Sequence, residues 1–101
     1  MKLEDKMLET EVERYLRQQV KKKLGGTALK FVSPGLSGVP DRIVLMPGGK
    51  IAFVETKAPG KKLRKLQEYV CGMIAALGFE VRRIDTKLGV DAFILEMEAR
   101  L

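Results

Sequence analysis

The sequence predicts an α/β fold in which a mixed sheet of about four strands is flanked by helices, in the order α-β-β-β-α-β-α. Three segments carry apolar residues at the spacing of an amphipathic helix, and short β-branched runs lie between them, next to glycine and proline. A chain of 101 residues is long enough for one compact core and too short for two ordinary domains. We therefore expect a single domain over residues 1–101.

The N-terminal third predicts a helix, a strand and a loop. The helix runs over about residues 3–24, and Gly25-Gly26 follows where a left-handed cap would end it. Residues 28–32 form a short strand-like segment, and residues 33–40 are dense in glycine, proline and serine. The helix is indicated by a repeating apolar stripe of Leu8, Val12, Tyr15, Leu16, Val20 and Leu24.

The middle of the chain predicts a β-hairpin. Residues 42–46 and 50–57 are both rich in β-branched and apolar residues, and Pro47-Gly48-Gly49 between them is a turn signal. If the loop is these three residues, Met46 pairs with Lys50 and Asp41 lies opposite Glu55. A four-residue loop would shift the pairing by one and separate the two carboxylates.

The C-terminal half predicts a helix, a strand and a helix. Apolar residues recur with helical spacing from Leu63 to Leu77, and Gly78 closes that helix. Residues 79–84 form a core strand. Thr86 is a candidate N-cap for a last helix through Glu98. Gly89 and Val90 have low helix propensity, so the sequence leaves the first residue of this helix open.

Composition excludes several kinds of chemistry. The chain has no histidine, which removes Ser-His triads, histidine bases and Cys/His zinc sites, and its single cysteine, Cys71, has the neighbours of a buried helix residue. The net charge of +6 favours a polyanionic partner. No apolar run approaches the length of a membrane span, and the acidic N-terminus does not resemble a signal peptide, so we expect a cytoplasmic protein that contacts no membrane.

Asp41, Glu55 and Lys57 are the candidate centre of an active site. The strand period of two places Lys57 on the face of Glu55 and leaves Thr56 on the other face. Two opposed carboxylates repel each other in a sheet, and a divalent cation would explain why they are placed together. A plain salt bridge between Glu55 and Lys57 is the alternative explanation.

These residues also carry a family resemblance. The segment Gly38-Val39-Pro40-Asp41-Arg42, a gap of thirteen residues, Glu55-Thr56-Lys57 and a later Gln67 resemble the VRR-Nuc family of the PD-(D/E)XK nuclease superfamily. The likeness extends through residues 25–35 and the 47–49 turn, and it is closest to the stand-alone viral and bacterial form. It implies a restriction-endonuclease-like core and metal-dependent cleavage of phosphodiester bonds.

The resemblance further implies a metal held by Asp41, Glu55 and the backbone carbonyl of Thr56, with Lys57 and Gln67 completing the catalytic group. Hard oxygen ligands suit Mg²⁺ or Mn²⁺. The family pattern also has a glutamate on the first helix. At about 100° per residue, Glu9 lies about 40° from the apolar stripe, against about 80° for Glu13 and 120° for Glu11. Glu9 is therefore our choice, with Glu13 second.

The expected substrate is DNA, contacted through its phosphate backbone. The candidate nucleic-acid contacts are Lys30 on the first strand, Ser33 in the loop that follows it, and Lys61, Lys62, Arg64 and Lys65, which begin the second helix. Lys21, Lys22 and Lys23 end the first helix, and we expect them near the site as well. The resemblance suggests branched DNA such as a four-way (Holliday) junction, and two symmetric cuts would require a twofold homodimer. The alternatives are a non-catalytic basic domain that binds nucleic acid, and an RNA-directed or exonucleolytic enzyme with the same centre.

Overall fold

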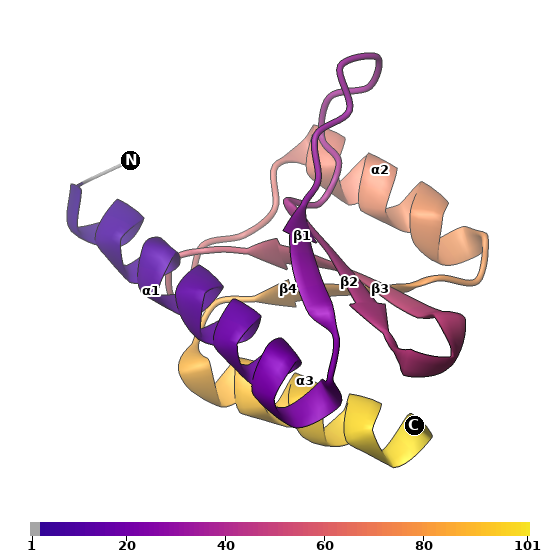
Figure 1. The fold of residues 1–101 in the computed structure, drawn as a ribbon. Coiled ribbons are helices and arrows are strands. Elements are labelled where there is room, and N and C mark those ends of the chain that lie inside the picture. The colour runs from indigo at the N-terminus through magenta and orange to yellow at the C-terminus, as the bar shows by residue number, and fades with distance from the viewer. Residues whose placement is uncertain (1–2) are drawn as a thin grey trace.

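A computed structural model describes residues 3–101, and it contains three long helices around a four-stranded sheet (Figure 1). The fold is mixed α/β, as the sequence predicted. In chain order the elements are α1 (Leu3–Gln19), a π-helical turn η1 (Val20–Leu24), β1 (Thr27–Lys30), β2 (Arg42–Met46), a 3₁₀ turn η2 (Pro47–Gly49), β3 (Lys50–Thr56), α2 (Lys65–Ala76), β4 (Glu80–Ile84) and α3 (Lys87–Arg100).

The strands lie in the order β1-β2-β3-β4. The first three are antiparallel, and β4 pairs in parallel with β3, with α2 as the crossover between them. Met46 lies opposite Lys50, so the three-residue loop and its register are confirmed. We call the end of the sheet at Asp41 and Thr56 the site end, and the end at the 47–49 turn the turn end.

Helices α1 and α3 pack against each other and cover one face of the sheet, while α2 lies on the opposite side against β4 (Figure 1). Alternate residues of β2 and β3 enter the core between the sheet and the two helices. Leu16, Val44, Val54 and Val90 are completely buried there, and Phe93 is nearly so. This packing fixes the end of α1 that carries its acidic residues beside the site end of the sheet.

The predicted first helix ends where expected, but its last turn widens from α to π geometry over Val20–Leu24. Gly25 then adopts the left-handed conformation, with φ of 66°, and its N–H bonds to the Val20 carbonyl. Gly26 passes so close to the sheet that a Cβ there would lie 2.2 Å from the Leu45 carbonyl oxygen. The glycine pair therefore both ends the helix and lets the chain enter β1.

Several predicted boundaries were wrong. The first strand ends at Lys30 rather than residue 32, because the chain turns away into the 31–41 loop after Phe31 bonds to the Asp41 carbonyl. Helix α2 begins only at Lys65, so the basic residues before it belong to a loop. The last helix continues to Arg100, two residues past the prediction, and the predicted Thr86 cap is present: its hydroxyl accepts from Gly89 N at 2.9 Å.

Within residues 3–101, none of the helices is long and apolar enough to cross a membrane.

Candidate active site

Asp41, Glu55 and Lys57 meet at the site end of the sheet. The three residues at the end of β3 are unusually well buried for their polarity: Glu55 is 5%, Thr56 0% and Lys57 7% exposed. Lys57 follows the last strand residue, and its N–H bonds to the Ile84 carbonyl at the end of β4. The sheet thus holds the ends of β3 and β4 together, and the charged side chains gather at these ends.

Asp41 is held by the backbone and side chain of one residue, Thr56. The Thr56 N–H donates to Asp41 Oδ1 at 3.0 Å and the Thr56 hydroxyl to Oδ2 at 2.6 Å. The N–H of Asp41 in turn donates to Glu55 Oε1 at 3.0 Å. The expectation of two carboxylates on one face therefore needs correction: Asp41 precedes β2, and beyond the strand its carboxylate reaches the side chain of Thr56.

Glu55 has partners from two further elements. Lys57 Nζ lies 3.3 Å from Glu55 Oε2, which confirms that these two side chains share a face. Gln67 Nε2 on α2 donates to the same oxygen at 3.1 Å, while Gln67 Oε1 accepts from the N–H of Arg64 at 3.0 Å. Gln67 therefore positions Glu55 against the start of α2, and both ends of its amide have protein partners.

These contacts do not fully offset the cost of burying the two charged carboxylates. Burial raises the pKa of Asp41 above its ordinary value, and the hydrogen bonds from Thr56 only partly oppose this rise. Burial also raises the pKa of Glu55, and the neighbouring charge of Asp41 raises it further against the opposing effect of Lys57. An additional cation at this position would therefore be favourable.

The donor set suits a hard cation that keeps part of its water shell. Asp41 and Glu55 supply two carboxylates, and the carbonyl of Thr56, the residue after Glu55, is a third oxygen. Among residues 3–101, no group of three acidic, histidine or cysteine side chains forms a ready-made metal cluster. Mg²⁺ is often bound by only one or two carboxylates together with water and substrate phosphate, so this pair fits that ion.

The three candidate glutamates of α1 are in different surroundings. Glu13 forms an ion pair with Arg42 of β2, and Glu11 is exposed. Burial raises the pKa of Glu9, and Lys57 and Asp41 both act on its charge, in opposite directions. Glu9 is thus affected by the charges of the candidate centre, and Glu13 in turn contributes to the raised pKa of Asp41.

The Arg42–Glu13 pair was not found by reasoning from the sequence. Arg42 has only 11% of its side chain exposed, and it also donates to the Ala28 carbonyl of β1 at 3.2 Å. Its Nε is the buried polar side-chain atom without a partner in the part of the chain that the structure describes. The residues are far apart in the chain, and no spacing rule joins a helix glutamate to a strand arginine.

Comparison with known proteins identifies the domain that carries these residues. The family model described as the VRR-NUC domain matches residues 3–87. The chain belongs to the VRR-NUC family. It is 48% identical over 79 residues to the protein named "Putative nuclease p44" of Acyrthosiphon pisum secondary endosymbiont phage 1, covering 78% of this chain and 84% of that one.

A solved structure described as a VRR_NUC domain superposes with a TM-score of 0.81 at 31% identity, over 86% of this chain and 94% of the other. The resemblance stated from the sequence is therefore confirmed at the level of family and fold. A nuclease domain acts on nucleic acid, and the candidate centre lies inside the matched region. Asp41, Glu55, Lys57 and Gln67 all fall within residues 3–87.

Several basic residues of the VRR-NUC domain lie at the site end of the sheet, and others lie at the turn end. The exposed Lys61, Lys62, Arg64 and Lys65 lie between β3 and the first residue of α2, at the site end. The expectation that all four begin the second helix was wrong. Lys30 ends β1 opposite Arg42, and Ser33 is half-buried in the loop that leads to Asp41, so both also lie at the site end.

The triplet Lys21 to Lys23 does not belong to this surface. It occupies η1, and Gly25 directly after it lies against the side chain of Pro47 in the turn. The expectation that these lysines are near the candidate centre was therefore wrong. The physical reason is that α1 runs along the sheet, which places its C-terminal end at the turn end.

Arg83 and Asp85 anchor the basic loop, a role that no local pattern in the sequence indicated. Arg83 Nη1 donates to the Lys61 carbonyl at 3.0 Å, and Asp85 Oδ2 accepts from the N–H of Gly60 at 2.8 Å. The two side chains also form an ion pair at 3.1 Å. Because β4 runs parallel to β3, its end delivers both residues to the site end.

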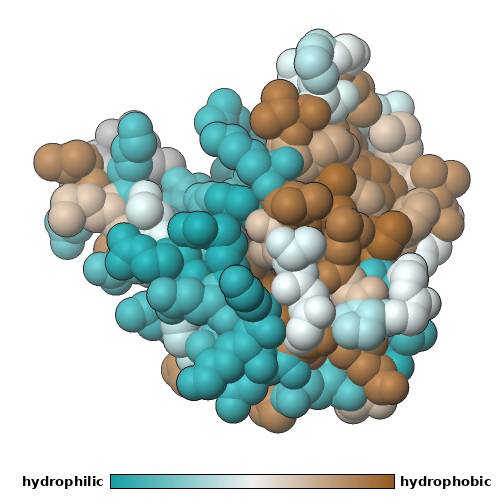
Figure 2. Space-filling view, in the orientation of Figure 1, coloured by the Kyte–Doolittle hydropathy of each residue, from teal (hydrophilic) through white to brown (hydrophobic). Residues whose placement is uncertain are grey.

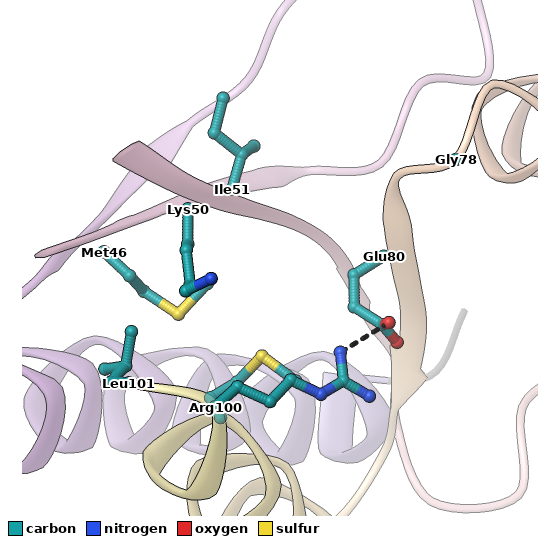
Figure 3. A pocket seen from close by; sticks show the side chains of 8 residues that line it. Met46, Lys50, Ile51, Gly78, Glu80, Arg100 and Leu101 are labelled. Atoms are coloured by element: carbon teal, nitrogen blue, oxygen red, sulfur yellow. Dashed lines mark hydrogen bonds and ion pairs between the residues drawn. The ribbon is translucent and has the colours of Figure 1, made fainter. Parts of the chain in front are cut away.

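A hollow at the turn end is separate from the candidate centre (Figure 3). It lies between the start of β3, the start of β4 and the end of α3, and an ion pair between Arg100 and Glu80, 2.7 Å apart, crosses it. Its lining includes Met46 and Lys50 beside the turn. The hollow therefore has no acidic residue of the candidate centre, and its single carboxylate already pairs with arginine.

Proposed function

We propose that this VRR-NUC domain is a metal-dependent endonuclease that hydrolyses phosphodiester bonds in DNA. The observation that carries the proposal is the buried group of Asp41, Glu55 and Lys57 at the site end. Two buried carboxylates with raised pKa values are unfavourable for a domain that only binds a polyanion, since they repel phosphate. They are useful where a divalent cation lies between protein and phosphate.

The residues divide into metal ligands and residues that act on the substrate. Asp41, Glu55 and the Thr56 carbonyl would hold Mg²⁺ or Mn²⁺, with Glu9 reaching from α1. The bound ion supplies Lewis acidity to a phosphate oxygen and lowers the pKa of an attacking water. Lys57 is held beside Glu55, so its ammonium can donate to that water or to charge that develops on phosphate.

The other residues position this centre. Gln67 fixes the Glu55 carboxylate by its 3.1 Å hydrogen bond, and Thr56 fixes both oxygens of Asp41. Lys61, Lys62 and Arg64 on the loop before α2 would contact backbone phosphates on either side of the cut, together with Lys30 and Ser33 beside the approach to Asp41. Six aromatic residues and no tryptophan leave little for base stacking, which favours recognition of backbone and shape.

The finer substrate proposal is branched DNA, with a four-way junction as the leading example. It rests on the family resemblance and on symmetry: one chain has one centre, and two matched cuts need two centres related by a twofold axis. We therefore propose a homodimer as the active form. A non-catalytic binding domain and an RNA-directed or exonucleolytic enzyme are the alternatives that a cleavage assay separates.

The test is a cleavage assay on labelled duplex, flap and four-way-junction DNA, and on matched RNA, with Mg²⁺, Mn²⁺ or EDTA. We expect internal cleavage that requires the metal and is fastest on the junction. Asp41→Asn should reduce it to background, and Lys57→Ala should slow it about 100- to 1000-fold. Glu11→Gln, an exposed α1 glutamate, is the matched control and should retain full activity.

Cleavage that survives in EDTA or in Asp41→Asn would contradict the metal mechanism. Tight binding of junction DNA without cleavage under any metal would favour the non-catalytic domain. Faster cleavage of RNA, or products released one nucleotide at a time from an end, would favour the third alternative.

A further inference from the structure

We propose that the loop between β1 and β2 inserts an apolar tip between stacked bases of DNA close to the cut. The inference rests on the proposed function and names the feature by which the domain would distinguish distorted DNA from regular duplex. We call residues 32–36 the loop tip. Its exposed apolar side chains are Val32, Pro34 and Leu36.

The loop tip lies near the candidate centre. Strand β1 ends at Lys30 and β2 begins at Arg42, and the Phe31 N–H donates to the Asp41 carbonyl at 2.8 Å, which closes the base of the loop. Figure 1 shows the loop projecting from the site end of the sheet, beyond the start of α2. The Cα atom of Leu36 lies within about 18 Å of that of Asp41, or roughly five base steps of 3.4 Å, because five residues span no more.

The body of the domain holds both legs of the loop. On the first leg, the ring of Phe31 contacts that of Phe53, with centroids 5.8 Å apart. On the second leg, Pro40 is fully buried, and Gly38 passes so close to α2 that a Cβ there would lie 2.9 Å from the side chain of Leu66. The legs are therefore fixed, and the loop tip extends from them into solvent.

The loop tip itself is a compact turn. The Leu36 N–H donates to the Ser33 carbonyl at 3.3 Å, so residues 33–36 form a β-turn with Pro34 at its second position, where the fixed φ of proline is favourable. Val32 is 67% and Leu36 39% exposed beside this turn. A turn that is already ordered loses little conformational freedom on binding, so its apolar side chains are suited to insertion.

The distribution of charge indicates that the loop tip meets bases and not phosphates. Residues 31–40 contain no charged side chain, although the chain has a net charge of +6 and the exposed Lys30, Lys61, Lys62 and Arg64 lie at the same end of the sheet. Cations bind the phosphate backbone, whereas side chains such as leucine and proline enter between base steps. The surrounding cations would thus hold the backbone while the loop tip contacts base faces.

The surface colours of the molecule agree with this division. Figure 2 shows pale and hydrophobic colours over the projecting loop at the top of the view, and strongly hydrophilic colours over α1. An apolar side chain exposed beside a phosphate-binding surface gains from contact with a base, because the faces of all four bases are apolar enough to stack. DNA bases are therefore the occupant that fits both the tip and its neighbours.

An inserted tip distinguishes DNA substrates by how easily their bases separate. In regular duplex the loop tip must break base stacking, whereas stacking is already interrupted at a mismatch, a bulge or a branch point. The apolar side chains of the tip offer no hydrogen bond to a base edge, so they respond to this ease of separation and not to sequence. The loop tip therefore favours DNA that is distorted within about five nucleotides of the cut.

The test uses 2-aminopurine, a base analogue whose fluorescence rises when it unstacks, placed within about five nucleotides of the branch of a four-way junction. Asp41→Asn protein keeps the DNA uncut, and we expect it to raise the fluorescence. Added Val32→Thr/Leu36→Gln should abolish most of this rise and increase the junction Kd about 5- to 150-fold, as loss of one stacking contact does. Added Leu36→Met keeps an apolar side chain and should retain both signals.

Leu95→Gln, added to Asp41→Asn, is the matched control. Leu95 is 67% exposed on α3, so its substitution removes a comparable apolar side chain away from the loop. It should leave the fluorescence rise and the Kd unchanged. The substituted side chains are all exposed, so every variant should keep the circular dichroism and Tm of Asp41→Asn.

A fluorescence rise that persists in Val32→Thr/Leu36→Gln, or that Leu95→Gln removes equally, would overturn the proposal. A cleavage assay with the wild type separates this result from the proposed activity. A wild type that unstacks the analogue but cuts no DNA would contradict the nuclease and support the inserted tip. A wild type that cuts the junction without any fluorescence rise would overturn the inserted tip alone.

Discussion

Glu9, Glu11 and Glu13 lie within two turns of one helix, yet their surroundings differ. Glu13 forms an ion pair with Arg42, and Glu11 is exposed to solvent. The charges of Lys57 and Asp41 act on the pKa of Glu9. A ligand role therefore fits Glu9, and a structural role fits Glu13. The distinction depends on what each side chain meets and not on the residue type, which is the same for all three.

Substitution of each glutamate by glutamine should separate these roles. Glu9→Gln should raise the Mg²⁺ concentration for half-maximal cleavage by about 10- to 100-fold with little change in Tm. Glu13→Gln should lower the Tm, because Arg42 would lose its charged partner in a nearly buried position. Glu11→Gln should change neither. A metal titration of cleavage and a melting curve give the two readouts, and a Glu9→Gln variant with wild-type metal dependence would remove Glu9 from the site.

Asp41 gives a prediction about pH. Its pKa is raised in the folded protein, mainly by burial, so its ionisation disfavours the folded state. The associated stability is present below the ordinary aspartate pKa of about 3.9 and is lost as the pH rises through the higher folded value. In EDTA at pH 7, Asp41→Asn should therefore melt a few degrees above the wild type, and the difference should disappear near pH 4.

Mg²⁺ provides the control for that measurement. Binding to the folded state should raise the Tm of the wild type and leave that of Asp41→Asn unchanged. If the wild type were the more stable protein at pH 7 in EDTA, burial would not dominate the energetics of Asp41.

At the level of elements, the N-cap of α3 supports the core. Thr86 accepts a hydrogen bond from Gly89 N, and the helix it begins buries Val90 and Phe93 against the sheet and α1. Thr86→Ala should destabilise the protein by about 1 kcal/mol, which corresponds to roughly 4–8 °C in Tm. Thr86→Ser keeps the acceptor and should recover most of this stability. Equal melting temperatures for the alanine and serine variants would show that the cap contributes nothing.

For the whole molecule, DNA binding should depend more on where the lysines lie than on the net charge. Lys61 and Lys62 lie at the site end, whereas Lys21 and Lys22 lie at the turn end. Lys61→Ala/Lys62→Ala should reduce the slope of log binding constant against log salt by up to about 2 on duplex DNA, roughly 1 for each phosphate that is no longer neutralised. Lys21→Ala/Lys22→Ala makes the same change in net charge and should leave the slope nearly unchanged. Fluorescence anisotropy at several salt concentrations measures both, and equal slopes would place DNA elsewhere.

Much of the fold follows from local signals in the sequence. The apolar spacing of residues 8–24, the Gly25-Gly26 stop, the turn at 47–49 and the Thr86 cap are all short-range features, and the structure contains each of them. The hairpin register was predictable because a three-residue turn determines which residues are opposite. Strand ends were less predictable, since residues 31 and 32 are apolar but follow the loop instead of the sheet.

The centre itself was predictable in part. The closeness of Asp41 to Glu55 and that of Lys57 to Glu55 follow from turn length and strand period, which the sequence contains. Gln67 was placed by family resemblance, and its hydrogen bond to Glu55 became visible only with α2 packed on the sheet. The Thr56 hydroxyl on Asp41 was not foreseen, because ideal alternation does not describe a side chain beyond the end of a strand.

Residue types and short spacings were enough to establish the family, the order of the elements and the acidic pair at the end of the hairpin. Three-dimensional packing decided which α1 glutamate pairs with Arg42, which basic residues share the end of the sheet with the acidic pair, and which apolar side chains remain uncovered. These outcomes depend on how helices dock across long separations in the chain. Docking is set by the summed packing of the core, and no local pattern reports it.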